Sequence, residues 1–435
     1  MKLTFLNHAS FVFSHKDKKI LFDPYLNGSA FNNGWHLICE EDHELYLKNI
    51  THIFFSHEHP DHFQPNFFKR FSDEEKAKIT IIYQKTYDKK VLNFCKKIGF
   101  NTLEVTNNSI FKIDEEISFQ CVKNPIYDSW CALYCEDEII LNVNDCVLDD
   151  PSLINKISKI LKRNPTVLFS QFSYSSFAYS ASERKALAKK KTDILLKQIN
   201  KINPKFVIPF ASFVYFSQED NFYMNDSIND VEKVHSLILN NTNSKSIIMK
   251  PNQEWDLNSE IDSNEAILFW MKKFREIKIK EIELKKYNYD ELKTSATKYQ
   301  KSIFKNNNKL LINILLFLKI IPHALFYVTD HKKYYQFSLG NSLIKIEKPL
   351  NGGYVSLKSD SLKFLFDYMF GLDTLLVNSR FTPSDKLAVN RLTRCFIFGG
   401  LNNTGRYLNK KLVISFFDYN FLKRSIKIFL KNFFK

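Results

Sequence analysis

Glycine and proline are scarce in this chain of 435 residues, with 10 and 12 copies. Such low contents exclude collagen-like repeats and Gly/Ser-linker architectures. Hydrophobic residues make up 44% of the chain, which supplies enough apolar side chains for a core and excludes disorder over the whole length. At roughly 150 residues per domain, the length predicts two or three domains.

Paired cysteine motifs and long apolar runs are also missing. The seven cysteines include no Cys-x-x-Cys pair, and the first residues do not form a signal peptide, so we expect a reducing, cytoplasmic location. The most apolar stretch, residues 310–328, contains Asn313, Lys319 and Pro322. These residues argue against a membrane span, and we predict a buried helix that breaks at the proline and precedes a strand.

The chain has a net charge of +15, which is typical of proteins with an anionic partner. The basic residues are scattered, however, and we expect no nucleic-acid partner. Arg184 and the lysines at 189–191 are predicted to form a solvated helix face. Only the tail, residues 416–435, interleaves Phe, Leu and Ile with Lys and Arg at helical spacing. This pattern fits a peripheral membrane helix or a terminal helix packed on its own domain.

The first 250 residues alternate short apolar strands with helical patterns. The early strands follow one another as hairpins, and later ones are separated by helices at 152–163, 181–202 and 226–239. Several strands are apolar on both faces, which predicts packed sheets with helices outside. We therefore expect a catalytic domain at 1–255, a Lys/Glu-rich helical connector at 256–306 and a small C-terminal α+β domain at 307–435.

The most informative segment is THIFFSHEHPDH, residues 51–62, where an apolar strand is followed by three histidines and an aspartate. His57 and His59, two residues apart on an extended turn, can direct their imidazoles at one ion. Asp61 and His62 can turn toward a second ion. Imidazole and carboxylate together are the ligands that borderline divalent metals prefer. The segment therefore predicts a site for two metal ions.

HxHxDH after an apolar strand resembles the metallo-β-lactamase fold, in its lactonase-like branch. The segments 7–10 (NHAS) and 20–24 (ILFDP) are similar to the opening hairpins of that branch. The resemblance covers about residues 1–255 and implies an αββα sandwich with the metal site at one edge. It also implies that Asp145 bridges the two ions, that Asp23 supports a histidine ligand, and that His8 contacts substrate or a ligand.

Two histidines of the family pattern are missing, since no histidine lies between His62 and His235. For the first missing position we predict Asp128. For the second, after the strand at 206–209, we consider Glu219 first and Asp220 second. Carboxylates in place of imidazoles shift the metal preference toward harder ions. We therefore favour iron, with zinc and manganese as alternatives.

The segments at 144–146, 171–185 and 209–226 resemble the metallo-β-lactamase part of CMP-N-acetylneuraminate and UDP-N-acetylmuramate hydroxylases. Those enzymes are associated with a Rieske iron–sulfur module, which requires paired Cys and His ligands. No cysteine in this chain is followed at two or three residues by histidine. The resemblance thus implies a separate electron donor.

Three hypotheses follow for the function. The first is a di-iron oxygenase that hydroxylates an amino sugar or a sugar nucleotide. The second is a hydrolase of lactonase or phosphodiesterase type, which uses a metal-bound hydroxide. The third is a degenerate binding scaffold, which the intact HxHxDH motif disfavours. The predicted metal ligands are His57, His59, Asp61, His62, Asp128, Asp145 and Glu219, and the predicted catalytic residues are Asp61, Asp145 and His8.

The region after residue 326, especially 373–378, resembles a sterol-carrier-type domain, a fold with an apolar cavity. A docking or dimerising domain would carry the same pattern.

Overall fold

The computed structural model describes residues 1–124, 128–146, 148–349 and 352–409. The chain divides into two compact units, Met1–Lys280 and Glu281–Lys435. The predicted connector at 256–306 spans this division: α7 (Asn264–Arg275) lies in the first unit and α8 (Tyr289–Asn306) in the second. The basic tail at 416–435 lies outside the described residues.

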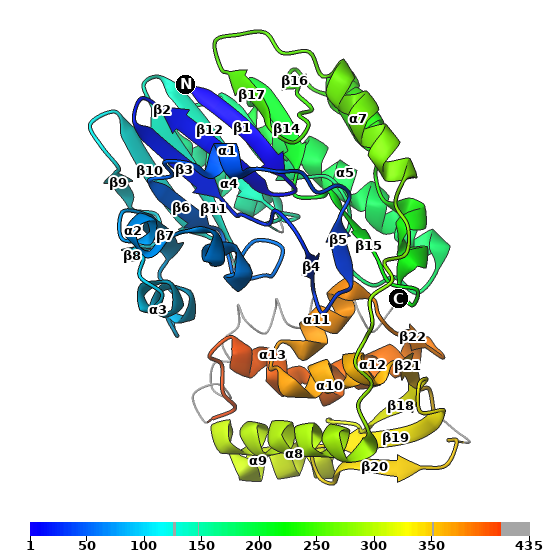
Figure 1. Ribbon diagram of the computed structural model, residues 1–435. Helices are drawn as coiled ribbons and strands as arrows, with labels where there is room; N and C mark the ends of the chain where they lie inside the picture. Colours follow the sequence, from blue (N-terminus) through cyan, green and yellow to red (C-terminus); the bar gives the residue numbers. More distant parts are fainter. Residues whose placement is uncertain (125–127, 147, 350–351, 410–435) are drawn as a thin grey trace. The chain divides into compact units, whose positions relative to one another are not determined.

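Two seven-stranded sheets build the first unit (Figure 1). The first sheet has the order β17-β1-β2-β3-β6-β7-β8. Its strands are β17 (Gln253–Asp256), β1 (Lys2–Asn7), β2 (Ser10–His15), β3 (Lys18–Phe22), β6 (His52–Phe55), β7 (Thr80–Gln84) and β8 (Asn101–Val105). From β3 to β8 all neighbouring strands are parallel.

The second sheet has the order β16-β14-β13-β12-β11-β10-β9. Its strands are β16 (Lys245–Ser246), β14 (Phe206–Phe210), β13 (Val167–Gln171), β12 (Glu138–Asn144), β11 (Ser129–Cys135), β10 (Ile117–Lys123) and β9 (Ile110–Lys112). A small third sheet joins β4 (Ser29–Ala30), β5 (Trp35–Leu37) and β15 (Val214–Phe216). The short strands β4, β5 and β15 carry too few residues to show an alternating pattern in the sequence.

Alternate side chains of the strands enter different apolar layers. Phe11 belongs to the core between the sheets, where its ring stacks at 4.2 Å on both Phe22 and Phe169. The adjacent Val12 belongs to a second cluster together with Phe68, on the other face of the first sheet. Strands that are buried on both faces have continuous apolar sequences. This explains why several strands of the first 250 residues are apolar at successive positions.

Helices cover the outer faces of the sandwich (Figure 1). They are α1 (Glu44–Leu47), α2 (Asp73–Lys76), α3 (Lys90–Lys97), α4 (Pro151–Leu161), α5 (Ala181–Ile202), α6 (Val231–Asn241) and α7, with 3-10 helices at Pro65–Arg70 and Phe222–Ser227. The predicted helix at 181–202 is confirmed, and the Ser180 hydroxyl caps it by accepting from the Glu183 N–H. The predicted αββα sandwich is confirmed as the fold of the first unit.

The second unit is an α+β domain, as predicted. Its sheet has the order β20-β19-β18-β21-β22, with β20 (Ser342–Ile346), β19 (Lys333–Ser338), β18 (Ala324–Val328), β21 (Val355–Leu357) and β22 (Thr382–Pro383). Its helices are α8, α9 (Lys309–Phe317), α10 (Ser359–Asp367), α11 (Gly371–Asn378), α12 (Lys386–Cys395) and α13 (Ile397–Asn403).

The expectation of a buried helix at 310–328 was wrong in one respect. Helix α9 forms and ends at Phe317, ahead of Pro322, and β18 follows. Only Ile312 of the helix is fully buried, whereas Leu310, Ile314 and Phe317 are exposed and its other apolar side chains are half-buried. An all-apolar helix shows no periodicity, so its sequence does not reveal which side faces the core. None of the described helices combines the length and hydropathy needed to span a bilayer.

Candidate metal centre

Strand ends from both sheets carry the predicted site residues. The chain leaves β1 into His8, β3 into Asp23, β6 into Ser56 and His57, and β12 into Asp145. Antiparallel pairing of β1 with β2 and of β2 with β3, followed by parallel pairing of β3 with β6, brings the first three ends to one edge. Loops at the carboxyl ends of strands are a common place for ligand sites.

Two of these residues, and the residue that precedes Asp145, have an unusual backbone conformation. His8, Asp23 and Asn144 have φ angles of 40°, 38° and 54°. The left-handed region is uncommon for residues other than glycine, although Asn, Asp and His tolerate it better than most. Such conformations persist where the surrounding structure enforces them, and they concentrate at functional sites.

The first cluster consists of His57, His59 and Asp145, whose ligand atoms lie within 4.8 Å of one another. The Nε2 of His57 lies 2.8 Å from the Nδ1 of His59 and 3.5 Å from the Oδ2 of Asp145. His57 is buried, whereas His59 is exposed and Asp145 is half-buried. The cluster therefore has a protected side and a side open to solvent.

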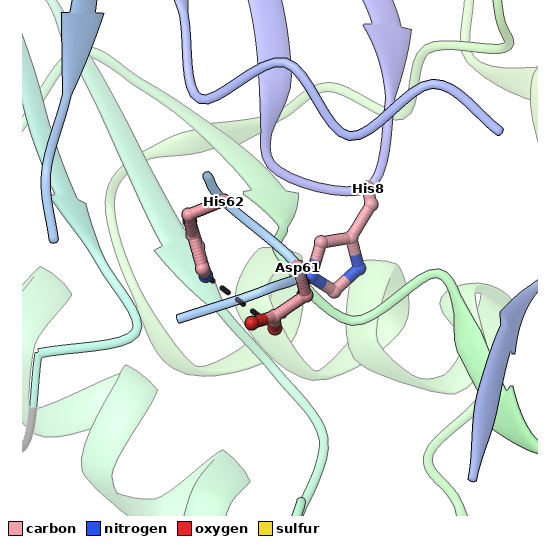
Figure 2. Close-up of side chains that lie close together, drawn as sticks. All are labelled: His8, Asp61 and His62. Atoms are coloured by element: carbon pink, nitrogen blue, oxygen red, sulfur yellow. Dashed lines mark ion pairs between the residues drawn. The ribbon is translucent and has the colours of Figure 1, made fainter. Parts of the chain in front are cut away.

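The second cluster consists of His8, Asp61 and His62, all buried and also within 4.8 Å (Figure 2). The Oδ2 of Asp61 lies 3.4 Å from the Nε2 of His8 and 3.5 Å from the Nε2 of His62. Figure 2 shows His8 reaching Asp61 from the turn between β1 and β2. His8 thus supplies an imidazole to this cluster from a segment more than 50 residues away in the chain.

Asp145 connects the two clusters. Its Oδ2 lies 3.5 Å from the Nε2 of His57 and 3.7 Å from the Nε2 of His62. The rings of His57 and His62 are 4.3 Å apart between centroids. One carboxylate oxygen is therefore close to a histidine of each cluster, the arrangement needed for a shared ligand.

A buried polar network contacts the imidazoles of His57 and His62 on the side that faces away from the two clusters. Asp23 accepts the Ser56 N–H at 2.7 Å and the Asn144 side-chain amide at 2.5 Å, and its Oδ2 lies 3.4 Å from the Nδ1 of His62. Ser56 Oγ lies 2.9 Å from the Nδ1 of His57 and accepts from Asn144 at 2.6 Å. With Nδ1 engaged behind the site, the Nε2 of each histidine faces the clusters.

The protonation equilibria of the second cluster are coupled. Burial alone would lower the pKa of His62, but Asp61 and Asp145 outweigh burial and raise this pKa well above its ordinary value. Burial likewise opposes the charged form of Asp61, yet His62 and His8 hold the Asp61 pKa well below its ordinary range. Burial lowers the pKa of His8 and that of His57, which favours neutral imidazoles able to act as ligands.

The donor set fits a pair of divalent ions. Five buried atoms of the two clusters have no hydrogen-bond partner among the described residues: His8 Nδ1, His8 Nε2, Asp61 Oδ1, His62 Nε2 and Asp145 Oδ1. Buried polar atoms without partners are costly, and metal coordination would satisfy those that face the clusters. Three imidazoles and two carboxylates with another exposed imidazole suit zinc, iron or manganese.

The remaining predicted ligands lie outside the two clusters. Asp128 stands just before β11, half-buried, and burial together with the negative charge of Asp145 raises its pKa to about 7. The Asp128 carboxylate interacts electrostatically with the His59 imidazole, so Asp128 lies near the first cluster. Its role as a metal ligand stays a prediction. Glu219 is exposed and Asp220 half-buried, and neither is brought into a cluster.

Two further residues support Asp145, and the sequence did not reveal them. Gln171, at the end of β13, donates to the Asp145 carbonyl oxygen at 2.5 Å. Lys191 of α5 donates to Gln171 at 2.9 Å. The expectation of a solvated helix face was therefore wrong for Lys191, which is half-buried, and for Arg184, which is buried and paired with Asp226. A lysine-rich helix gives no sequence signal of which lysine turns inward.

Comparisons with known proteins agree with the fold of the first unit. Residues 2–130 match the family model described as the beta-lactamase superfamily domain. Over 281 residues the chain is 24% identical to cytidine monophosphate-N-acetylneuraminic acid hydroxylase of Xenopus laevis, covering 59% of this chain and 46% of that protein. A human relative named as an inactive form of this hydroxylase is 22% identical over 277 residues, covering 59% and 54%.

Among solved structures, the isothiocyanate hydrolase from Delia radicum gut bacteria is 13% identical, with a TM-score of 0.43, covering 59% of this chain and 99% of that one. The chain spans about half the length of the curated relatives it matches. The first unit has the metallo-β-lactamase fold and resembles the hydroxylase at low identity.

Proposed function

We propose that this chain, with its metallo-β-lactamase fold, is a dinuclear metalloenzyme that hydroxylates an amino sugar or a sugar nucleotide. The observation that carries the proposal is the pair of clusters joined by Asp145, whose Oδ2 lies within 4 Å of both His57 and His62. The similarity to the sialic-acid hydroxylases over 59% of the chain supports the reaction class.

In the proposed enzyme, His57, His59 and Asp145 would hold one ion and His8, Asp61 and His62 would hold the other, with Asp145 close enough to His62 to serve both. A bound pair of iron ions would supply the redox chemistry that O2 activation requires. Placing one oxygen atom of O2 in a C–H bond and reducing the other to water consumes two electrons and two protons. The proposal therefore includes a separate electron-donor protein and a reducing, cytoplasmic setting.

The chain's own residues position this centre. Asp23 holds the proton of His62 on Nδ1, and Ser56 fixes the ring of His57 from behind. Gln171 anchors the backbone of Asp145. The exposed edge of His59 and the half-buried Asp145 leave one side of the first cluster open, where a substrate can approach. Asp128, with its pKa raised to about 7, stands near that side and is proposed as a further ligand or a proton carrier.

A hydrolase of lactonase or phosphodiesterase type is the second candidate. The observation that favours it is the same close spacing of two clusters, because paired ions that share a carboxylate also serve two-metal hydrolysis. The two candidates differ in the metal they need and in their dependence on O2.

Metal analysis of protein purified without added metal separates them. The proposal predicts about two irons per chain and O2-dependent gain of one oxygen atom by a sugar nucleotide when a chemical reductant is supplied. Two zinc ions per chain together with O2-independent ester cleavage would instead identify the protein as a hydrolase.

His59→Ala tests the centre itself and should remove most of the bound metal, because a lost ligand loosens the whole site. The matched control is His235→Ala, a histidine of α6 outside both clusters. Equal metal content in the two variants would contradict the assignment.

A further inference from the structure

Helix α9 of the second unit has an exposed apolar face. The exposed fractions along this segment are 85% for Phe317, 69% for Leu310, 57% for Leu318, 47% for Ile320 and 43% for Ile314. Ile312, on the opposite side, is fully buried and fixes the helix to its domain. Exposed large side chains at i, i+4, i+7 and i+8 lie on one face of a helix.

This apolar face stands in a strongly basic stretch. Between Glu291 and Asp330 the chain contains six lysines and no acidic residue. Lys305 is exposed in the last turn of α8, Lys309 at the start of α9, and Lys319 just beyond the end of α9. Arg394 adds a further positive charge there, since its guanidinium donates to the Ile320 carbonyl oxygen at 2.7 Å.

We propose that α9 docks this protein on an anionic lipid surface, with Leu310, Ile314, Phe317 and Leu318 in the interface and the surrounding lysines against the headgroups. Amphipathic helices bind membranes in this way, through buried apolar area combined with electrostatic attraction to anionic lipids. Juxtaposed lysines strengthen such binding and make it sensitive to salt.

Charge argues against two other occupants of the face. The last 26 residues follow Asn409, and the N–H of Asn308, beside the start of α9, donates to the Leu408 carbonyl oxygen at 2.8 Å. The tail could therefore reach the helix, but residues 410–435 contain seven basic residues and one acidic residue. A second copy of α9 would also bring lysines against lysines. An anionic surface complements both segments, and like charges in contact are unfavourable.

Vesicle co-sedimentation of the full chain tests the proposal. The protein should bind vesicles that contain phosphatidylglycerol at low salt, release them at high salt, and ignore vesicles of pure phosphatidylcholine. The double variant Leu310→Asp with Phe317→Asp should bind about tenfold more weakly, a factor that corresponds to about 1.4 kcal/mol. The matched control Leu268→Asp changes a leucine of α7 that is also 69% exposed and should bind normally.

Circular dichroism of each variant checks that these exposed substitutions leave the fold intact. Unchanged vesicle binding by the α9 variant would overturn the proposal, as would wild-type protein that stays in the supernatant at low salt. Loss of binding in Phe421→Asp with Phe429→Asp, alongside normal binding by the α9 variant, would assign the contact to the tail instead. A dimer that the α9 variant dissociates, without any vesicle binding, would assign the face to a second copy.

Discussion

Replacing Asp23 by asparagine should weaken metal binding at the second cluster. The carboxylate is fully buried, and its Oδ2 lies 3.4 Å from the Nδ1 of His62, the nitrogen that faces away from the cluster. Asparagine keeps the shape and tolerates the left-handed backbone at this position, where φ is 38°. It removes the negative charge that favours a proton on Nδ1 and a free lone pair on Nε2.

The magnitude follows from the partners that Asp23 loses. Its two oxygens accept from Ser56 N–H at 2.7 Å and from the Asn144 amide at 2.5 Å, so an amide nitrogen must face one of these donors. A buried donor without an acceptor costs about 1–3 kcal/mol. Residues that orient histidine ligands change metal affinity by about 10- to 100-fold, which corresponds to about 1.4–2.7 kcal/mol.

Competition with a chromophoric chelator measures the affinity, and denaturation of the metal-free protein measures the stability separately. Asp17→Asn, at an exposed position, is the matched control. We expect Asp23→Asn to weaken the site that contains His62 more than the other site. Wild-type affinity at both sites would refute the role assigned to Asp23.

Three further outcomes are expected. Metal binding should release a proton and tighten as the pH rises, because Asp61 keeps metal-free His62 protonated above its ordinary pKa. Isothermal titration calorimetry in buffers of different ionisation enthalpy measures this proton release. Equal heats of binding in all buffers would contradict the prediction. Asp360→Ala should lower stability in urea unfolding by more than Lys363→Ala. It removes a carboxylate that lies 2.7 Å from the fully buried Arg380 guanidinium, whereas Lys363 forms a partly exposed pair worth under about 1 kcal/mol. All seven cysteines are buried, and burial raises the pKa of each thiol, so a thiol reagent should label the native protein slowly and the unfolded protein fully.

The strands and the local motif were predictable because their signals are contiguous in the chain. THIFFS is a buried parallel strand, and the four polar residues of HEHPDH that were singled out follow directly from its end. The left-handed position at Asn144 and the carboxylate of Asp145 likewise follow a buried strand. That Asp145 meets the histidines after β6 was implied by the family resemblance and not by these local signals, because β6 and β12 belong to different sheets.

The contact between His8 and Asp61 could not be predicted from contiguous sequence signals. His8 lies 53 positions before Asp61 in the sequence, and only the register of β1, β2 and β3 brings the hairpin turn to the edge where β6 ends. The resemblance implied a contact of His8 with substrate or a ligand, but not its place in one cluster with Asp61 and His62. Exposure of α9 was equally hidden, since an apolar helix looks the same from every side.

Three carboxylates surround His62 of the second cluster. Asp61 and Asp145 approach His62 Nε2 at 3.5 and 3.7 Å, and Asp23 approaches its Nδ1 at 3.4 Å. A protonated His62 therefore compensates carboxylates on both sides, which is why its pKa is raised despite burial. Isolated buried carboxylates would otherwise be expelled or neutralised. Because a divalent ion would take over this compensation, a proton on His62 and a metal ion would compete for the same set of residues.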